Sequence, residues 1–256
     1  METNEINVYS YNYPKGLMDG YVKIHLDSFC RWGKCFKGYG GCADRGPRFD
    51  DCEIWDVQKI LAEIVKNLEK NPNARFFLET PNFFDPYKMT GENRYQFQEI
   101  MDKKIKAYLT IQTTPHDLIN LLAHQYEVSI YPKDIRMSGI QEIWMGLESA
   151  NRELRDKYSK PPFQNEHLLK IVKHLRQADI RCCSYLVVSS DDTDDTIAET
   201  VDFIKEMKPD KIFQFDLFHY VAGERYVDYK MMKQRMDDLV RYQEIFKKLE
   251  KEINKF

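Results

Sequence analysis

The chain has 256 residues, a formal net charge of −3 and a pI near 6.1, and 43% of its residues are hydrophobic. This size suits one α/β barrel-type domain or two small domains, and the charge indicates no broad nucleic-acid footprint, although it leaves a local RNA contact open. No apolar run approaches the roughly 18–20 residues that span a bilayer, and the acidic N-terminus lacks the apolar segment of a signal peptide. We therefore expect a cytoplasmic protein with no membrane partner.

The first part of the chain is predicted to run from an irregular lead-in through one strand and a loop to a helix. Residues 1–20 are polar and rich in turn residues, and Tyr21–Asp27 alternates as a half-buried strand does. A loop rich in cysteine and glycine follows. An apolar stripe then indicates a helix from about Glu53 to Glu69.

Three of the six cysteines, Cys30, Cys35 and Cys42, fall within this loop. Three thiolates leave one corner of a four-coordinate site or cubane open for a small-molecule ligand. The intervening glycines accept positive φ, so the loop can wrap tightly and direct amide N–H groups at an anionic cluster. We interpret the loop as the site of an iron–sulfur cluster with one open iron. A zinc site completed by Cys52, a disulfide or free thiols, and no ligand role at all are the alternatives.

The remaining chain alternates between strand and helix patterns. Strands are expected at Arg75–Glu79, Ala107–Gln112, Glu142–Gly146, Cys182–Val188 and Lys211–Leu217. Helices are expected at about residues 93–103, 115–125, 132–137, 152–158, 164–178, 196–207 and 229–255. This alternation predicts a parallel sheet with right-handed crossovers.

In such folds the functional side chains gather where strands end and loops begin. Six polar or thiol side chains lie near predicted strand ends: Cys30, Glu79, Gln112, Glu148, Ser189 and Asp216. The pattern therefore predicts that the cysteine loop faces a cavity that these side chains share.

Four stretches of the sequence resemble the radical S-adenosylmethionine superfamily. The cysteine loop follows the first strand, and residues 143–151 (IWMGLESAN) resemble the family's segment at the end of strand four. Lys160 with the helix that ends in residues 175–180 (LRQADI), and residues 194–223 with their YVAG ending, complete the resemblance. The cysteine spacing differs, because four and six residues separate the cysteines where the family usually has three and two.

The resemblance implies an α/β fold, a partial (βα)6 TIM-like barrel with parallel strands. It would place the radical S-adenosylmethionine core at residues 21–225, after the lead-in, with residues 226–256 as a C-terminal helix packed on the core. It also implies that Cys30, Cys35 and Cys42 hold a 4Fe–4S cluster.

The same resemblance assigns cofactor contacts to four residues. Glu79 ends strand two, where the family commonly contacts the amine of S-adenosylmethionine, and a carboxylate suits a cation there. Glu148 and Ser149 match a position that touches the ribose or methionine part, and Lys160 could reach a carboxylate or an anion next to the cluster. Glu79 could instead be a solvated or capping residue, Ser149 a helix cap, and Lys160 a surface residue. No catalytic residue is indicated.

The function that the resemblance implies is that of a radical S-adenosylmethionine enzyme. Such an enzyme cleaves S-adenosylmethionine reductively, and the 5′-deoxyadenosyl radical abstracts hydrogen from a substrate, here unidentified. The substrate would be a small molecule or would be carried by a partner, and the electron would come from a donor such as flavodoxin or ferredoxin. The alternatives are a zinc-stabilised α/β binding protein and a catalytically degenerate homologue that acts as an interaction subunit.

Overall fold

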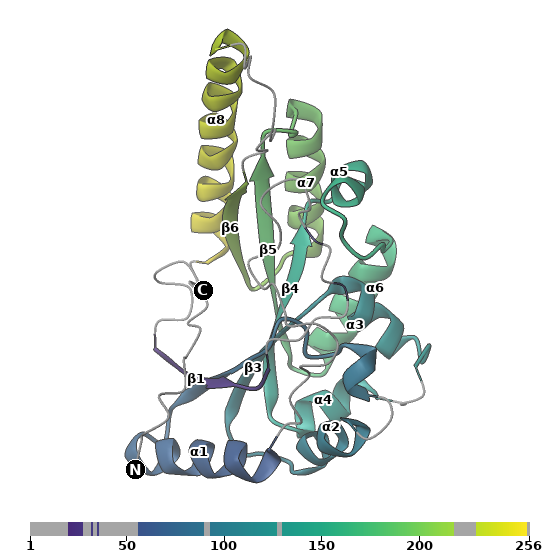
Figure 1. Ribbon diagram of the computed structural model, residues 1–256, viewed down its shortest axis with the longest axis vertical. Coiled ribbons are helices and arrows are strands. Elements are labelled where there is room, and N and C mark those ends of the chain that lie inside the picture. Colours follow the sequence, from purple (N-terminus) through teal and green to yellow (C-terminus); the bar gives the residue numbers. More distant parts are fainter. Residues whose placement is uncertain are drawn as a thin grey trace, which may run out of the picture.

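A computed structural model describes residues 20–27, 32, 35, 56–89, 93–126, 130–217 and 229–254. Its centre is one six-stranded sheet in which every adjacent pair is parallel and the strands follow chain order (Figure 1). The strands are β1 (Tyr21–His25), β2 (Arg75–Glu79), β3 (Tyr108–Thr113), β4 (Ile140–Glu148), β5 (Arg181–Ser189) and β6 (Lys211–Leu217). The predicted α/β fold with parallel strands is confirmed.

Helices lie between successive strands, as crossovers between parallel strands require. They are α1 (Val57–Lys70), α2 (Asn93–Asp102), α3 (Pro115–Leu122), α4 (Pro132–Met137), α5 (Arg152–Lys157), α6 (Asn165–Gln177), α7 (Asp194–Met207) and α8 (Tyr229–Ile253). A short 3₁₀ helix, η2 (Pro86–Met89), lies between β2 and α2 and was not predicted. Strand β4 is longer than predicted and includes Glu148.

Local sequence accounts for where several helices begin. Thr114 precedes α3, its hydroxyl accepts the backbone N–H of Asp117 at 3.1 Å, and Pro115 occupies the first helical turn. Helix α7 has an equivalent cap, because the Thr193 hydroxyl accepts from the N–H of Thr196.

The two faces of the sheet have different neighbours. On one face, strand residues such as Phe76 and Met145 join helix residues such as Leu168 and Ile204 in a single large hydrophobic core. On the other face, Phe77, Trp144, Cys183 and Tyr185 form a separate cluster, and we call this the inner face. The alternation of β-strands puts successive side chains on opposite faces, so each strand contributes to both.

The inner face is closed at the amino-terminal ends of the strands by a network around Glu142, which is fully buried. Its carboxylate accepts hydrogen bonds from the hydroxyls of Tyr21 and Tyr108, each at 3.1 Å, and forms ion pairs with Arg181 at 3.4 Å and Lys211 at 3.7 Å. The Lys211 ammonium also lies 5.9 Å from the centre of the Tyr21 ring. These contacts join β6 to β1, the two strands at opposite edges of the sheet.

Burial of this network changes the acidity of its tyrosines. Desolvation, followed by the nearby negative charge of Glu142, raises the pKa of both Tyr21 and Tyr108 above the ordinary value. Both hydroxyls therefore remain protonated donors at neutral pH. Within the part of the chain that the structure describes, no helix is long and apolar enough to cross a membrane.

Candidate functional site

The carboxyl ends of β1 and β2 bring a histidine to a carboxylate. His25 and Glu79 are register partners in the parallel pair, and His25 Nδ1 lies 3.5 Å from Glu79 Oε2. The Glu79 side chain is only 11% exposed, whereas that of His25 is 44% exposed. Glu79 is thus held at the end of its strand as predicted, with an acidic group available to a cationic ligand group; its role in cofactor binding remains a prediction.

Two of the predicted residues meet at the end of β4. Lys160 Nζ lies 2.6 Å from Glu148 Oε1, and their side chains are 15% and 7% exposed. The two residues belong to β4 and to the loop before α6, so only the fold brings them together. Lys160 is therefore part of a largely buried ion pair, and the alternative of an exposed surface lysine is wrong.

The backbone at Glu148 is shaped to hold this carboxylate. Glu148 has φ of +64°, a conformation uncommon for a residue other than glycine, and the register with β5 shifts between Gly146 and Glu148. A Cβ placed on Gly146 would lie 2.7 Å from Glu148 Oε1. The carboxylate folds back over Gly146, so a side chain at this position would have to displace it.

The loop that carries Lys160 also contacts the cysteine loop. The indole N–H of Trp32 donates a hydrogen bond to the carbonyl of Ser159, which itself has φ of +54°. Trp32 lies between Cys30 and Cys35 in the sequence. This contact links the cysteine loop to the residue next to Lys160, over a separation of 127 positions.

The three predicted cluster ligands are described only in part. Cys35 is 8% exposed, so its thiol is buried as a structural or ligating thiol would be. Cys30, Cys42 and the alternative zinc ligand Cys52 lie outside the described residues. Among the residues that the structure does describe, no group of three or more potential metal ligands gathers.

Ser149 occupies a different environment from Glu148. Its hydroxyl lies 3.1 Å from that of Thr200 in α7 and accepts a hydrogen bond from the Asn151 N–H at 3.1 Å. The serine is 1% exposed. These contacts place the side chain toward α7 and give it a role in shaping the loop after β4, while its contact with a cofactor remains a prediction.

A buried polar network at the carboxyl ends of β1 and β2 was missed by sequence reasoning. Lys88 Nζ lies 3.0 Å from Asp27 Oδ1 and 2.9 Å from the carbonyl of Asn82, and it also contacts the Thr80 hydroxyl. Lys88 and Asp27 have side chains only 3% and 1% exposed. Asp27 stands three residues before Cys30, so this pair fixes the end of β1 where the cysteine loop departs.

The network continues from Asn82 to the beginning of α3. The Asn82 amide donates to Asp117 at 2.7 Å, its oxygen accepts from the Thr113 hydroxyl at 2.8 Å, and Asp117 also accepts from Tyr126 at 2.6 Å. The only sequence signal for this network was Lys88, a charged residue close to the polar segment 80–82 that follows β2. It could not identify Asp27 as the partner.

Between the strand ends and the Glu142 network, aromatic rings fill the inner face. Trp144 and Tyr185 are stacked, with ring centres 5.0 Å apart, and the Tyr185 hydroxyl lies 3.5 Å from the Gln112 side chain. Gln112, predicted from its strand end, is therefore on the same face as Glu79 and Glu148. These side chains lie toward the carboxyl ends of β2, β3 and β4, beyond the aromatic layer.

No protein-family model matches the sequence, and no curated protein matches it. Solved structures do resemble the fold. The radical S-adenosylmethionine methyltransferase TsrM from Kitasatospora setae, solved with cobalamin and a [4Fe-4S] cluster, aligns with a TM-score of 0.54 at 14% identity, over 77% of this chain and 36% of that one. Coproporphyrinogen III oxidase HemN from Escherichia coli, a radical S-adenosylmethionine enzyme, aligns with a TM-score of 0.52 at 14% identity, over 87% and 52%.

A third structure, the cobalamin-dependent S-adenosylmethionine radical enzyme OxsB, aligns with a TM-score of 0.51 at 15% identity, over 88% of this chain and 30% of that one. The present chain thus spans between about a third and a half of these three proteins. At these identities the likeness shows the fold, which is the partial barrel of the radical S-adenosylmethionine enzymes.

Proposed function

We propose that this chain, whose fold is that of the radical S-adenosylmethionine enzymes, is itself such an enzyme. The observation that supports this most directly is the meeting of Glu148, Lys160 and the Trp32 contact of the cysteine loop at the carboxyl ends of the strands. Parallel α/β folds use these ends for chemistry. The residues converge here although they come from three separate parts of the sequence.

The described residues fit the expected groups. Cys35 is a buried thiol, and Cys30, Cys35 and Cys42 would hold a 4Fe–4S cluster. Glu79 would accept the amine of S-adenosylmethionine, and Glu148 with Lys160 would contact its polar ribose or methionine part. When bound, these groups supply one-electron reduction and a radical able to abstract hydrogen, while the protein supplies orientation and excludes water.

The arrangement gives each side chain a separate task. Lys160 and Glu148 neutralise each other, so a ligand that binds there exchanges hydrogen bonds with an existing pair and does not meet an unpaired buried charge. The Lys88–Asp27 pair fixes the segment just after β1, three residues before Cys30 in the sequence. The stacked rings of Trp144 and Tyr185 form a buried aromatic layer against which a substrate would pack.

Anaerobic purification with iron and sulfide analysis tests the proposal, followed by electron paramagnetic resonance of the reduced protein with and without S-adenosylmethionine. We expect about four irons per chain, a spectrum that changes with S-adenosylmethionine, and release of 5′-deoxyadenosine on reduction. Replacing Cys30, Cys35 or Cys42 by alanine should abolish the cluster. Cys52→Ala is the matched control and should retain it.

Two other results would overturn the proposal in different ways. One tightly bound zinc, no iron and a requirement for Cys52 would indicate the zinc-stabilised binding protein. An intact cluster whose spectrum does not respond to S-adenosylmethionine, with no cleavage, would indicate a degenerate homologue that serves as an interaction subunit.

A further inference from the structure

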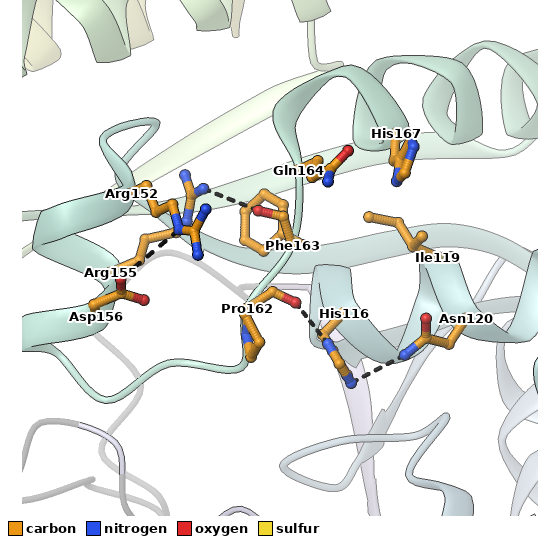
Figure 2. Close-up of a pocket in the computed structure, with 10 residues that line it drawn as sticks. All are labelled: His116, Ile119, Asn120, Arg152, Arg155, Asp156, Pro162, Phe163, Gln164 and His167. Atoms are coloured by element: carbon orange, nitrogen blue, oxygen red, sulfur yellow. Dashed lines mark hydrogen bonds and ion pairs between the residues drawn. The ribbon is translucent and has the colours of Figure 1, made fainter.

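A cavity lies outside the sheet, among α3, α5, the start of α6 and the loop before α6 (Figure 2). Its volume is about 260 Å³. The rings of Phe163 and Pro162 and the side chain of Ile119 form its apolar walls, and two arginines, Arg152 and Arg155, lie on one side. Glu79, Glu148 and the cysteines do not line this cavity, so it is distinct from the candidate site described above.

Arg155 brings a buried positive charge to this wall. It is 3% exposed, and its guanidinium donates to the carbonyls of Ser149 at 2.8 Å, Ala150 at 2.6 Å and Phe163 at 3.1 Å, and to the Asn165 side-chain oxygen at 3.1 Å. All four acceptors are neutral. Within the described ranges, Arg155 forms no ion pair, and desolvation lowers its pKa to about 10, so it remains charged at neutral pH.

Arg152 adds a second positive charge at the mouth of the cavity. Its side chain is 79% exposed, and its one ion pair among the described residues is with Asp156, where Arg152 Nε lies 3.8 Å from Asp156 Oδ2. An exposed pair at this distance is weak. Asp156 is also the single carboxylate that lines the cavity, so the lining carries two guanidinium groups against one acid.

The opposite wall is held in place by His116. His116 Nδ1 lies 2.6 Å from the carbonyl of Pro162, and Nε2 lies 3.0 Å from the Asn120 amide nitrogen. A carbonyl can only accept, so Nδ1 carries the proton, and the amide group donates to Nε2 (Figure 2). These two contacts fix the imidazole of His116 in the cavity wall, and the exposed residue His167 of α6 lines the same cavity.

We infer that this cavity binds a small organic oxyanion, a phosphate or carboxylate attached to an apolar group. The oxyanion would displace Asp156 from Arg152 and sit in the field of Arg155, and the apolar group would rest against Phe163 and Ile119. The exposed guanidinium of Arg152 suits this ligand because a guanidinium can donate parallel hydrogen bonds to two oxygens of one anion, whereas Arg155, already bonded to four protein acceptors, contributes its charge. The volume limits the ligand to a small molecule.

An occupant would also act on the neighbouring loop. The wall residues Pro162 and Phe163 follow Lys160 by two and three positions, and their carbonyls are held by His116 and Arg155. Ligand contacts to this wall would therefore restrict the loop that presents Lys160 to Glu148. The binding inference itself does not depend on the proposed radical chemistry.

Isothermal titration calorimetry of the full chain, purified anaerobically in low-salt buffer without phosphate, tests the inference with phenyl phosphate as the probe. We expect one saturable site. Arg152→Gln should weaken binding roughly tenfold, since it removes a charged hydrogen-bonding partner. Asp156→Asn should strengthen binding by up to about fivefold, because it removes a competing carboxylate.

Arg241→Gln is the matched control, because Arg241 is also an exposed arginine paired with acids, on α8, and it should bind the probe as the wild type does. Benzoate and inorganic phosphate identify whether the carboxylate or phosphate chemistry is preferred and how much the ring contributes. The inference is overturned if the wild type shows no saturable binding of either aromatic probe, or if Arg152→Gln and Asp156→Asn both bind like the control.

Discussion

Lys160 Nζ lies 2.6 Å from Glu148 Oε1, across the gap between the end of β4 and the loop before α6. Both side chains are largely buried, and the carboxylate is folded over Gly146 by a backbone with positive φ. A buried ion pair of this kind contributes little net stability, because the cost of desolvating the two charges offsets much of their attraction. The proposed ligand-binding role of Glu148 and Lys160 would account for their burial.

The first prediction concerns Lys160. Lys160→Met should weaken binding of S-adenosylmethionine roughly tenfold, because it removes a charged donor and leaves Glu148 without this partner. Equilibrium dialysis of the reconstituted protein measures the affinity, and circular dichroism monitors folding. Lys160→Arg should restore part of the affinity. Unchanged affinity in the methionine variant would remove Lys160 from the cofactor site.

The second prediction concerns Gly146. A Cβ here would lie 2.7 Å from Glu148 Oε1, so Gly146→Ala should displace the carboxylate and weaken cofactor binding while the sheet still forms. A double-mutant cycle with Glu148→Gln measures the coupling. If Gly146 acts through Glu148, then adding Glu148→Gln to Gly146→Ala should cost little further affinity. Fully additive losses would contradict this relationship.

The third prediction concerns the buried pair of Lys88 and Asp27. Lys88→Met should destabilise the protein by about 3–5 kcal/mol, because it leaves a buried carboxylate without its cation. Chemical denaturation measures this free energy of unfolding. Lys66→Met is the matched control, because Lys66 pairs with Glu63 on the exposed face of α1, and it should change stability very little.

The same pair also bears on cluster assembly. Asp27 precedes Cys30 by three residues, so displacement of the end of β1 should lower the iron content of the Lys88→Met protein even where it remains folded. The double variant Asp27→Asn with Lys88→Met should recover part of the stability, since no unpaired charge remains. A double variant as unstable as the single one would show that the charge pair is not the cause.

The fourth prediction concerns the two adjacent cysteines of β5. Desolvation and then the charge of Asp210 raise the pKa of Cys182 to about 12, and desolvation and then Glu142 raise that of Cys183 well above its ordinary value. Because only the thiolate is nucleophilic, both should resist alkylation in the folded protein from neutral pH to about pH 9.

Mass spectrometry after iodoacetamide treatment checks this prediction, with the urea-unfolded protein as the control in which both thiols react. Resistance would support the interpretation that these two cysteines pack within the sheet and ligate no metal. Rapid alkylation of either thiol in the folded protein would contradict their burial.

Among the described residues, sequence patterns were sufficient to predict the six strands and the eight α-helices, since these depend on local periodicity and caps, but they missed η2 and the full length of β4. The alternation of Tyr21–Asp27, the apolar run in β5 and the Thr114–Pro115 start of α3 each reflect forces within a few residues. Parallel topology followed from the order of elements. Glu79 and Glu148 were predicted as site residues because parallel strands end at one edge.

Only the tertiary structure decided which of these groups meet. Glu148 pairs with Lys160, Lys88 with Asp27 across 61 positions, and Trp32 with Ser159 across 127, and no local pattern encodes such choices. These pairings depend on the path of each crossover loop. They also depend on the free-energy cost of leaving a buried charge unpaired. Ser149 is the clearest case, because its sequence neighbour faces the site while its own hydroxyl contacts Thr200 of α7.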